Sequence, residues 1–414
     1  MKTVEYRTIE GRSAGYYSLL VLLGVLVVLG LAAAHYMDVE GHHVTGMNNQ
    51  IVWGTPHVFA VFLIVAASGA LNVASIASVF GKPMYYPLAR LSGLLAITVL
   101  IGGLAILVLD LGRPDRLVVA MTYYNFKSIF AWNIFLYTGF LAVVVVYLWM
   151  MFERRMNRYS TPAGYVAFVS RLVLTTGTGS IFGFLVARQA YDAAIMAPMF
   201  IVMSFAFGTA LFILMLMGLS RGTRLPLGDA ILQRLRNLLG IFVMTLLYFV
   251  VVYNITNLYA TEHHSWQRFL LLDGGVYTLL FWVVQMLLGG LLPLAFFFLP
   301  VFRGLRLWTV IGAALVIIGG LAQIYVIIIG AQAYPLVVFP GMEVHSNFFD
   351  GVVGRYAPSV PEIVLGLGGA AFALLLTLLA MRVLPFLPVS LADNDLPGLG
   401  LPREKLEQSE ATAT

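Results

Sequence analysis

Long runs of apolar residues, separated by short polar stretches, follow one another along almost the whole chain. Ten of them are long enough to cross roughly 30 Å of hydrocarbon at about 1.5 Å per helical residue. They are residues 16–36, 56–80, 88–109, 128–152, 163–187, 193–219, 238–260, 276–299, 307–330 and 363–384. The pattern predicts an all-α integral membrane protein with ten transmembrane helices in a single membrane domain, residues 1–384.

Composition and charge agree with this prediction, because 60% of the 414 residues are hydrophobic and only 10% are charged. The mean hydropathy is +0.92. The fifth run is the weakest, since it contains Arg171 and the stretch TTGTGS. Counting it as a span puts 17 Lys and Arg on one side of the membrane and 6 on the other, whereas omitting it gives 12 on each side. Positive residues gather in cytoplasmic loops, so we expect ten spans in a bacterial inner membrane, with both termini cytoplasmic.

The polar connections fall into two kinds. The longest outer loop, residues 331–362, contains FPGMEVHSNFFDGVVGRY, whose aromatic and histidine content predicts a folded loop packed on another part of the protein. Residues 385–414 are rich in Pro, Gly and acidic side chains, which predicts a flexible cytoplasmic tail. The net charge of +5 follows from the Lys and Arg of the cytoplasmic loops. We therefore expect lipid as the surroundings and no nucleic-acid partner.

The stretch LDLGRPDRL, residues 109–117, places four charged side chains directly after the third apolar run. Pro114 disfavours helical geometry at Arg113, so the helix is expected to stop here. Asp110 then lies in the last helical turn, where the macrodipole disfavours a carboxylate by about 0.3–1 kcal/mol. We expect Arg113 and Arg116 to compensate this charge and to leave a carboxylate of tunable proton affinity at the membrane edge. The alternative is a charge cluster that only stops the helix.

The histidines are confined to one side of the predicted membrane. All seven fall at outer helix ends or in outer loops: His35, His42, His43, His57, His263, His264 and His345. This distribution predicts proton chemistry on the outer face. It argues against a transmembrane pair of haems, but one outer b-type haem, ligated for example by His57 and His264, stays open as an alternative. The chain has no cysteine, so it cannot itself hold an iron–sulfur cluster, and its electrons must come from elsewhere.

Polar residues within two of the spans keep to one helix face. The two sets are His57, Ser68, Asn72 and Ser75 in the second span, and Asn254, Asn257, Thr261 and His264 in the seventh. Such stripes face a protein interior or a wet cavity rather than lipid. For any single residue, hydrogen bonding between helices is the commoner role.

Further polar groups gather at the outer ends of the fifth, sixth and seventh spans, in ARQAYDAAIMAPMF and TEHH. Quinone chemistry needs a hydrogen-bonding group for each carbonyl oxygen, a carboxylate or imidazole to carry protons, and an apolar entrance. As catalytic residues we predict Asp110, His57, Arg113, Glu262 and His264. As quinone-binding residues we predict Asn72, Arg116, Tyr191, Asp192, Asn257 and His263. We predict no metal site.

The stretches DLGRPDR, WGTPHVFAVFLIVAASGALNVASI and YNFKSIFAWNIFLY together resemble the NrfD/PsrC family of quinone-interacting membrane subunits. The ten-span form and the segment IFGFLVARQAYDAAIMAPMFIVMSFAFG are most similar to its DsrP branch, found in DsrMKJOP sulfur-metabolism complexes. The resemblance covers nearly the whole chain. It implies two four-helix bundles, 56–187 and 193–330, flanked by two peripheral helices. Among the site residues it carries over only Asp110, Arg113, Pro114, Arg116 and the start of the second span, with its histidine.

The resemblance also implies partners: a DsrO-like periplasmic iron–sulfur protein, a DsrJ-like haem c subunit, and DsrM-like cytochrome b and DsrK-like cytoplasmic iron–sulfur subunits. We therefore expect a subunit, not catalytic alone, that exchanges electrons between menaquinone or ubiquinone and the periplasmic iron–sulfur partner, with proton exchange on the outer face. The rival is a proton-coupled transporter or ion-conducting module, in which Arg171 and the Gly-rich fifth span line a half-channel. We expect Arg171 to be paired or to face water. A purely structural anchor is the third alternative.

Overall fold

The computed structural model describes residues 4–302, 304–336 and 351–398. This part of the chain contains ten helical spans that are long and apolar enough to cross a membrane, which confirms the predicted all-α class. The α-helices are α1 (Ala14–Glu40), α2 (Thr55–Ala70), α3 (Asn72–Ser78), α4 (Ala89–Leu109), α5 (Leu117–Thr122), α6 (Ile129–Phe152), α7 (Ser160–Gly183), α8 (Met196–Thr223), α9 (Asp229–Tyr259), α10 (His264–Arg268), α11 (Val276–Leu279), α12 (Leu292–Phe298), α13 (Arg306–Tyr325), α14 (Ala331–Ala333) and α15 (Val360–Val383).

Shorter elements join or extend these helices. Three are π-helical: η6 (Phe269–Asp273), η7 (Leu280–Leu291) and η9 (Val326–Gly330). Short 3₁₀ segments are η1 (His42–Val44), η2 (Pro83–Leu88), η3 (Pro114–Arg116), η4 (Asn157–Tyr159), η5 (Thr261–His263) and η8 (Pro300–Phe302). Two-residue strands β1 (Tyr6–Arg7) and β2 (Leu387–Pro388) pair antiparallel.

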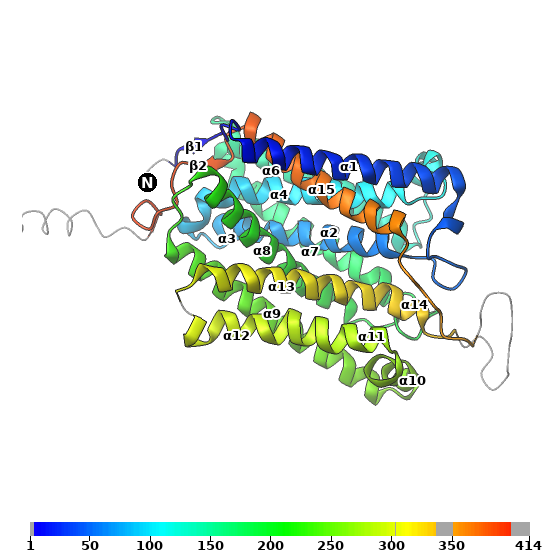
Figure 1. The fold of residues 1–414 in the computed structure, drawn as a ribbon. Helices are drawn as coiled ribbons and strands as arrows, with labels where there is room; N and C mark the ends of the chain where they lie inside the picture. Colours follow the sequence, from blue (N-terminus) through cyan, green and yellow to red (C-terminus); the bar gives the residue numbers. More distant parts are fainter. Residues whose placement is uncertain (1–3, 303, 337–350, 399–414) are drawn as a thin grey trace, which may run out of the picture.

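The long helices lie side by side in an elongated array (Figure 1). α1 and α15 pack together along one side, α9, α11 and α12 lie along the opposite side, and α2, α8 and α13 run between them. α2 packs on α4, while α6 packs on α7, and α8 packs on α9 and α13. These contacts agree with groups formed by spans 2–5 and 6–9, which we call the first and second groups. α2 also packs extensively on α8 across the two groups, so the division into two bundles stays an interpretation.

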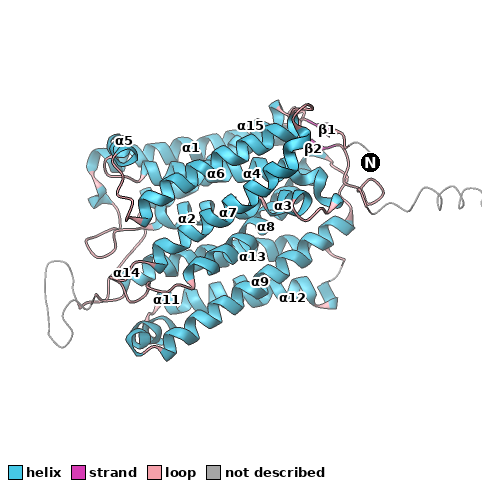
Figure 2. Ribbon diagram, turned by 180° about the vertical axis from the view of Figure 1, so that it is seen from behind, coloured by secondary structure: helices cyan, strands magenta, loops and turns pink. Residues whose placement is uncertain are grey.

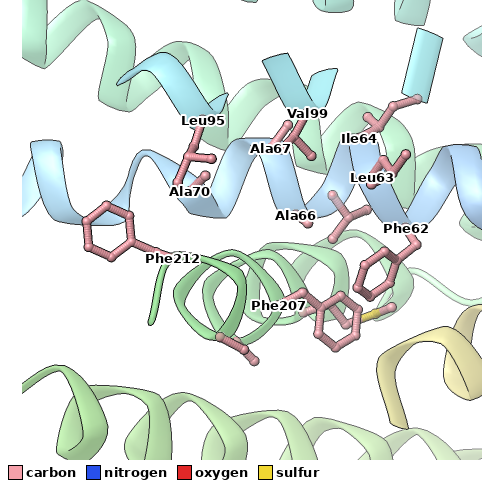
Figure 3. Close-up of a cluster of buried hydrophobic side chains, with 14 of the residues drawn as sticks. Phe62, Leu63, Ile64, Ala66, Ala67, Ala70, Leu95, Val99, Phe207 and Phe212 are labelled. Carbon is pink, nitrogen blue, oxygen red and sulfur yellow. The ribbon is translucent and has the colours of Figure 1, made fainter. Parts of the chain in front are cut away.

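The core lies where α2 meets α4 and α8. Figure 3 shows side chains of these helices interleaved there, among them Phe62, Leu95 and Phe207. Nearly all of α2 is buried within the protein. Its backbone approaches α8 so closely that a Cβ on Gly69 would lie 1.6 Å from the carbonyl oxygen of Ser204. Small residues permit this approach, which replaces lipid contact with helix packing.

The array has two ends of different character. At the end where α4 finishes, called the Asp110 end, lie the last turn of α1, the start of α2, α5 and α10 (Figures 1 and 2). The opposite end carries β1 and β2 and is called the strand end. Residues 385–398, which the sequence assigned to a flexible tail, instead pack there. Leu387 and Leu391 are buried, and the Leu391 N–H donates to the carbonyl of Pro226. Residues 399–414 lie outside the described part.

The predicted outer loop 331–362 is shorter than expected, because helical structure continues to Ala333 and resumes at Val360. Its described residues 351–359 do pack on the protein: the Gly354 N–H donates to the carbonyl of Ala333 at 2.7 Å. Residues 337–350, including His345, lie outside the described part. At the other boundary of note, α9 begins at Asp229 rather than at 238, since its first turns are amphipathic and bury Ile231 and Leu235.

Candidate functional site

Asp110 is the residue at which α4 ends. Its backbone is still helical, with φ −90° and ψ 0°, and its N–H donates to the carbonyl of Ile106. The chain leaves the helix at Arg113, with φ −141° and ψ 71°, because Pro114 follows. The side chain of Asp110 is only 1% exposed. A carboxylate is thus buried at the C-terminal end of a helix, where the dipole opposes negative charge.

Two histidines from earlier in the chain lie against this carboxylate. His57 Nδ1, in the first turn of α2, is 3.0 Å from Asp110 Oδ2. His42 Nε2, in η1, is 3.8 Å from Asp110 Oδ1 and 3.0 Å from the backbone oxygen of the same residue. The two imidazole side chains are 23% and 30% exposed, so they connect the buried carboxylate with the surface. We call Asp110, His42 and His57 the Asp110 cluster.

Arg113 and Arg116 do not compensate Asp110, contrary to the sequence prediction. Arg113 instead makes two hydrogen bonds to the Asp115 carboxylate, both at 3.0 Å. These bonds lower the pKa of Asp115 and raise the pKa of Arg113. Arg113, Asp115 and Arg116 are all outside the buried interior. The reason lies in the backbone, since the turn at Pro114 leads these side chains away from the end of α4.

An aromatic wall stands beside the cluster. The Trp53 ring stacks near the His57 imidazole, with centroids 6.2 Å apart and planes at 25°. It also contacts Phe130 and Phe182 edge-on. An imidazole between a carboxylate and an aromatic surface suits a planar ligand with hydrogen-bonding edges. Sequence reasoning missed both His42 and Trp53 as site residues, although the histidine pair at 42–43 and the segment WGTPH were signals that could have found them.

The segment before α2 is held by residues from the second group. The Gln332 side chain accepts hydrogen bonds from the N–H groups of Val52 and Trp53 at 2.9 and 3.1 Å, and donates to the Trp53 carbonyl at 3.0 Å. Arg188 donates to the carbonyls of Gln50 and Gln332 at 2.8 and 2.9 Å. The position of Trp53, and through it of the cluster, therefore depends on the connection between α7 and α8 and on the end of the ninth span.

Four predicted residues lie at the Asp110 end but outside the Asp110 cluster: Asp192, Glu262, His263 and His264. All but His263 are exposed. α9 ends at Tyr259, so His264 begins α10 and does not continue the polar face of the seventh span. His264 Nε2 contacts the carbonyl of Leu258, and His263 Nδ1 is 2.7 Å from the carbonyl of Gln189. The polar stripe of the seventh span is thereby reduced to its two asparagines.

Asn72 and Arg171 meet in the interior of the first group. Arg171 is 3% exposed, and its Nη1 donates to Asn72 Oδ1 and, at 3.4 Å, to the carbonyl of Ser68. Its guanidinium carbon is 5.0 Å from the ring centroids of both Phe168 and Phe205. The expectation that Arg171 is paired is confirmed. Its acceptors are neutral, and no carboxylate of the described residues lies within ion-pair distance of it.

Tyr191 and Asn257 lie in the second group. Tyr191 is buried, which raises the pKa of its hydroxyl, and it donates to the carbonyl of Ile328 at 3.1 Å. Asn257 faces the hydroxyl of Tyr253. Beside them is a cavity of about 30 Å³ lined by Tyr253, Trp266 and amide side chains. A smaller cavity of about 20 Å³ adjoins it. No residue of the Asp110 cluster lines either cavity.

Metal binding finds no support in the described residues, where no group of three or more His, Asp or Glu side chains is arranged to hold an ion. The haem alternative required His57 and His264 to act together. His57 Nδ1 is engaged with Asp110, and His264 is exposed with its Nε2 on a backbone carbonyl. These residues lend a haem no support. What the Asp110 cluster can do is hold a proton on a buried carboxylate and pass it through imidazoles to water.

Three relatives cover most of the chain. A protein of Archaeoglobus fulgidus described as an Hdr-like menaquinol oxidoreductase integral membrane subunit is 28% identical, over 93% of this chain and 97% of the relative. The putative C subunit, in the membrane, of a dimethyl sulfoxide reductase of Halobacterium salinarum is 27% identical, over 88% of this chain and 90% of the relative. The C subunit of the selenate reductase of Mesobacillus selenatarsenatis is 22% identical, over 88% and 93%.

The family comparison agrees with these relatives and with the fold. The model of the family described as "Polysulphide reductase, NrfD" matches residues 43–335, which is well over half of the chain and includes Asp110 and His57 of the Asp110 cluster. Ten helical spans accompany this match. The chain therefore belongs to the NrfD family of multi-pass integral membrane proteins.

Proposed function

We propose that this chain is the quinone-interacting membrane subunit of a redox complex. In this proposal it exchanges electrons between the quinone pool and an iron–sulfur partner docked at the Asp110 end, which is the outer face. The observation that carries the proposal is the Asp110 cluster, a carboxylate that is 1% exposed beside two partly exposed imidazoles. The relatives named as subunits of menaquinol, dimethyl sulfoxide and selenate redox enzymes support the same class.

The residues at the cluster fit a quinone. Both Asp110 carboxylate oxygens and His57 Nδ1 are buried and lack a well-aligned hydrogen bond within the described residues. A quinol hydroxyl would satisfy the carboxylate, and the Trp53 ring would cover one face of the ligand. When bound, a quinol supplies two electrons and two protons. Asp110 would hold a proton, and His57 and His42 would deliver it to water, since their side chains reach the surface.

The electron partner is a separate protein in this proposal, because the chain has no cysteine with which to hold an iron–sulfur cluster. The Archaeoglobus relative is named for menaquinol, which favours menaquinone over ubiquinone. The DsrP-like motifs extend the proposal to sulfur metabolism, with DsrO-like and DsrJ-like partners at the outer face and DsrM-like and DsrK-like subunits completing the complex.

The rival transporter required Arg171 to line a water-filled half-channel. In the structure the guanidinium packs between two phenylalanine rings and donates to neutral acceptors. No observation at Arg171 therefore favours conduction, and the outer glutamate, aspartate and histidines of the second group enter the proposal only as surface groups near the partner.

The test is Asp110→Asn, which keeps the side-chain shape and removes proton transfer. We expect the complex to assemble and quinol-linked electron transfer to fall by about 10²–10⁴-fold, as for loss of a general acid or base. Asp115→Asn is the matched control, because it removes an exposed carboxylate of the same motif. Rates are measured in membranes across pH. Parental turnover in Asp110→Asn at every pH would show that the motif only ends the helix.

A further inference from the structure

The segment Trp-Gly-Thr-Pro-His, residues 53–57, leads into α2, and its glycine and threonine have no part in the chemistry proposed above. The first N–H groups of a helix lack partners within it, and Pro56 has none to offer. No side chain of the segment caps α2. Instead, the Thr55 N–H donates to the hydroxyl of Tyr356 at 2.6 Å. A residue from 301 positions further along the chain thus caps the helix that carries His57.

Proton counting fixes the direction of each bond at Tyr356. A phenol has one proton, and Tyr356 donates it to Glu362 Oε1 at 2.6 Å. The Thr55 hydroxyl, 2.8 Å away, must therefore donate to Tyr356. Burial and the bond to Glu362 raise the pKa of Tyr356, so the phenol stays protonated. Glu362 thereby sets the direction of both bonds that hold Thr55.

Glu362 is the centre of this arrangement. It lies in the first turn of α15 and is 0% exposed. Its second oxygen accepts from the N–H groups of Gly46 and Ser359 at 2.9 and 2.8 Å. Three segments, η1 to α2, the end of the outer loop, and α15, therefore meet at one carboxylate. Hydrogen bonds to an ionised acceptor are about twice as strong as neutral ones.

Gly54 explains why the motif contains glycine. A Cβ there would lie 2.3 Å from Glu362 Oε1 and 2.8 Å from the Tyr356 hydroxyl. Gly46 is equally confined, since its Cβ would meet the carbonyl oxygen of Ala357 at 2.1 Å. The backbone around the carboxylate leaves no room for side chains at these two positions. The start of α2 is seated against Glu362 and Tyr356 by direct backbone contact.

We propose that Glu362 and Tyr356 are positioning residues for His57. They hold Thr55 by its N–H and hydroxyl, and His57 is two residues further on in the same helical turn. The 3.0 Å approach of His57 to Asp110 therefore depends on a carboxylate at the start of the last helix. This inference rests on the proposed function of the Asp110 cluster, and it adds residues that lie outside the family match at 43–335.

The first experiment compares Tyr356→Phe and Glu362→Gln in the assembled complex in membranes. Tyr356→Phe removes only the hydroxyl that joins Thr55 to Glu362. Because small misplacements of a reacting group cost on the order of 10²-fold, we expect a loss of about tenfold to hundredfold in quinol-linked electron transfer, with an altered pH profile. Glu40→Gln is the control, since Glu40 is an exposed glutamate at the same end, on α1. If Glu362→Gln prevents assembly, Tyr356→Phe decides the matter.

A double-mutant cycle separates positioning from a general structural role. If Tyr356 acts through His57, then Tyr356→Phe should change the rate less than about twofold in a His57→Gln background. Losses that multiply in the double variant, or a parental rate and pH profile in Tyr356→Phe, overturn the inference. Asp110→Asn reports on the proposed function separately. A slow Asp110→Asn with a parental Tyr356→Phe rejects the positioning role alone, whereas a parental Asp110→Asn rejects the function beneath it.

Discussion

A buried charge needs partners, and Asp110 and Arg171 obtain theirs in different ways. Asp110 is met by imidazoles, which carry positive charge only when protonated, so its surroundings can change charge as protons move. Arg171 is met by an amide, a carbonyl and two aromatic faces, which stay neutral. The first arrangement is suited to proton exchange, and the second keeps a fixed cation between α2, α7 and α8.

The Arg171 arrangement predicts an unequal effect of removing either partner. Asn72→Leu strands a buried cation without its amide acceptor and should lower the free energy of unfolding by about 1–3 kcal/mol. Arg171→Met should be milder, because it removes the cation itself. Adding Arg171→Met to Asn72→Leu should restore stability, as measured by thermal unfolding in nanodiscs. If Arg171→Met is the more damaging single change, the contacts of the cation stabilise the bundle by more than its burial costs.

The residue scale also shows where sequence reasoning stops. The end of α4 could be predicted, because Pro114 excludes helix at Arg113. The need of Asp110 for a compensating charge followed from the helix dipole. The partner could not be found in the same way, since proximity in sequence suggested Arg113, whereas His57 lies 53 positions earlier and meets Asp110 only because α2 packs on α4. Glu362 gave no local signal at all.

At the scale of elements, the three π-helical segments of the described chain all contribute to one place. Leu270 of η6, Phe281 and Gln285 of η7, and Val326 and Ile327 of η9 line the cavity of about 30 Å³ in the second group. π-helical turns are rare and frequent at functional sites. Hydropathy predicted the eighth and ninth spans correctly but held no sign of these turns, because they change hydrogen bonding and leave composition unchanged.

We predict that this cavity holds water. Trp266 Nε1, Asn257 Nδ2 and Gln267 Oε1 are buried beside it without a well-aligned partner in the described structure. About 10–15 Å³ admits a water molecule, whereas a benzene-sized ring fills a cavity of roughly 150 Å³. Hydroxyl radicals formed by X-rays from bound water should therefore oxidise Met199, which lines the cavity, far more than Met203, which is equally buried but does not. Equal protection of both methionines would mean a dry cavity.

At the scale of the whole molecule, the two ends differ in chemistry. The six described histidines lie at the Asp110 end, while the Lys and Arg residues favour the strand end by 17 to 6 in the sequence-based count. A protein inserted by the positive-inside rule would therefore place the Asp110 cluster outside and both termini in the cytoplasm. The packing of β1 on β2 joins the two terminal segments on that same side. Orientation in a membrane is a property of the whole chain, so it needs its own test.

Reporter fusions provide that test, with alkaline phosphatase to mark the outer side and green fluorescent protein to mark the cytoplasm. Fusions after Gly228, between α8 and α9, and after Arg403, beyond β2, should be fluorescent and lack phosphatase activity. A fusion within residues 341–356 should show the reverse, because an odd number of spans separates it from each of the other two. Moving positive charge to the connection between α6 and α7 should strengthen this orientation, while adding it near Asp110 should weaken it. Phosphatase activity after Gly228 together with fluorescence within 341–356 would place Asp110, His42 and His57 on the cytoplasmic side. The proton exchange and the iron–sulfur partner would then belong to that side as well.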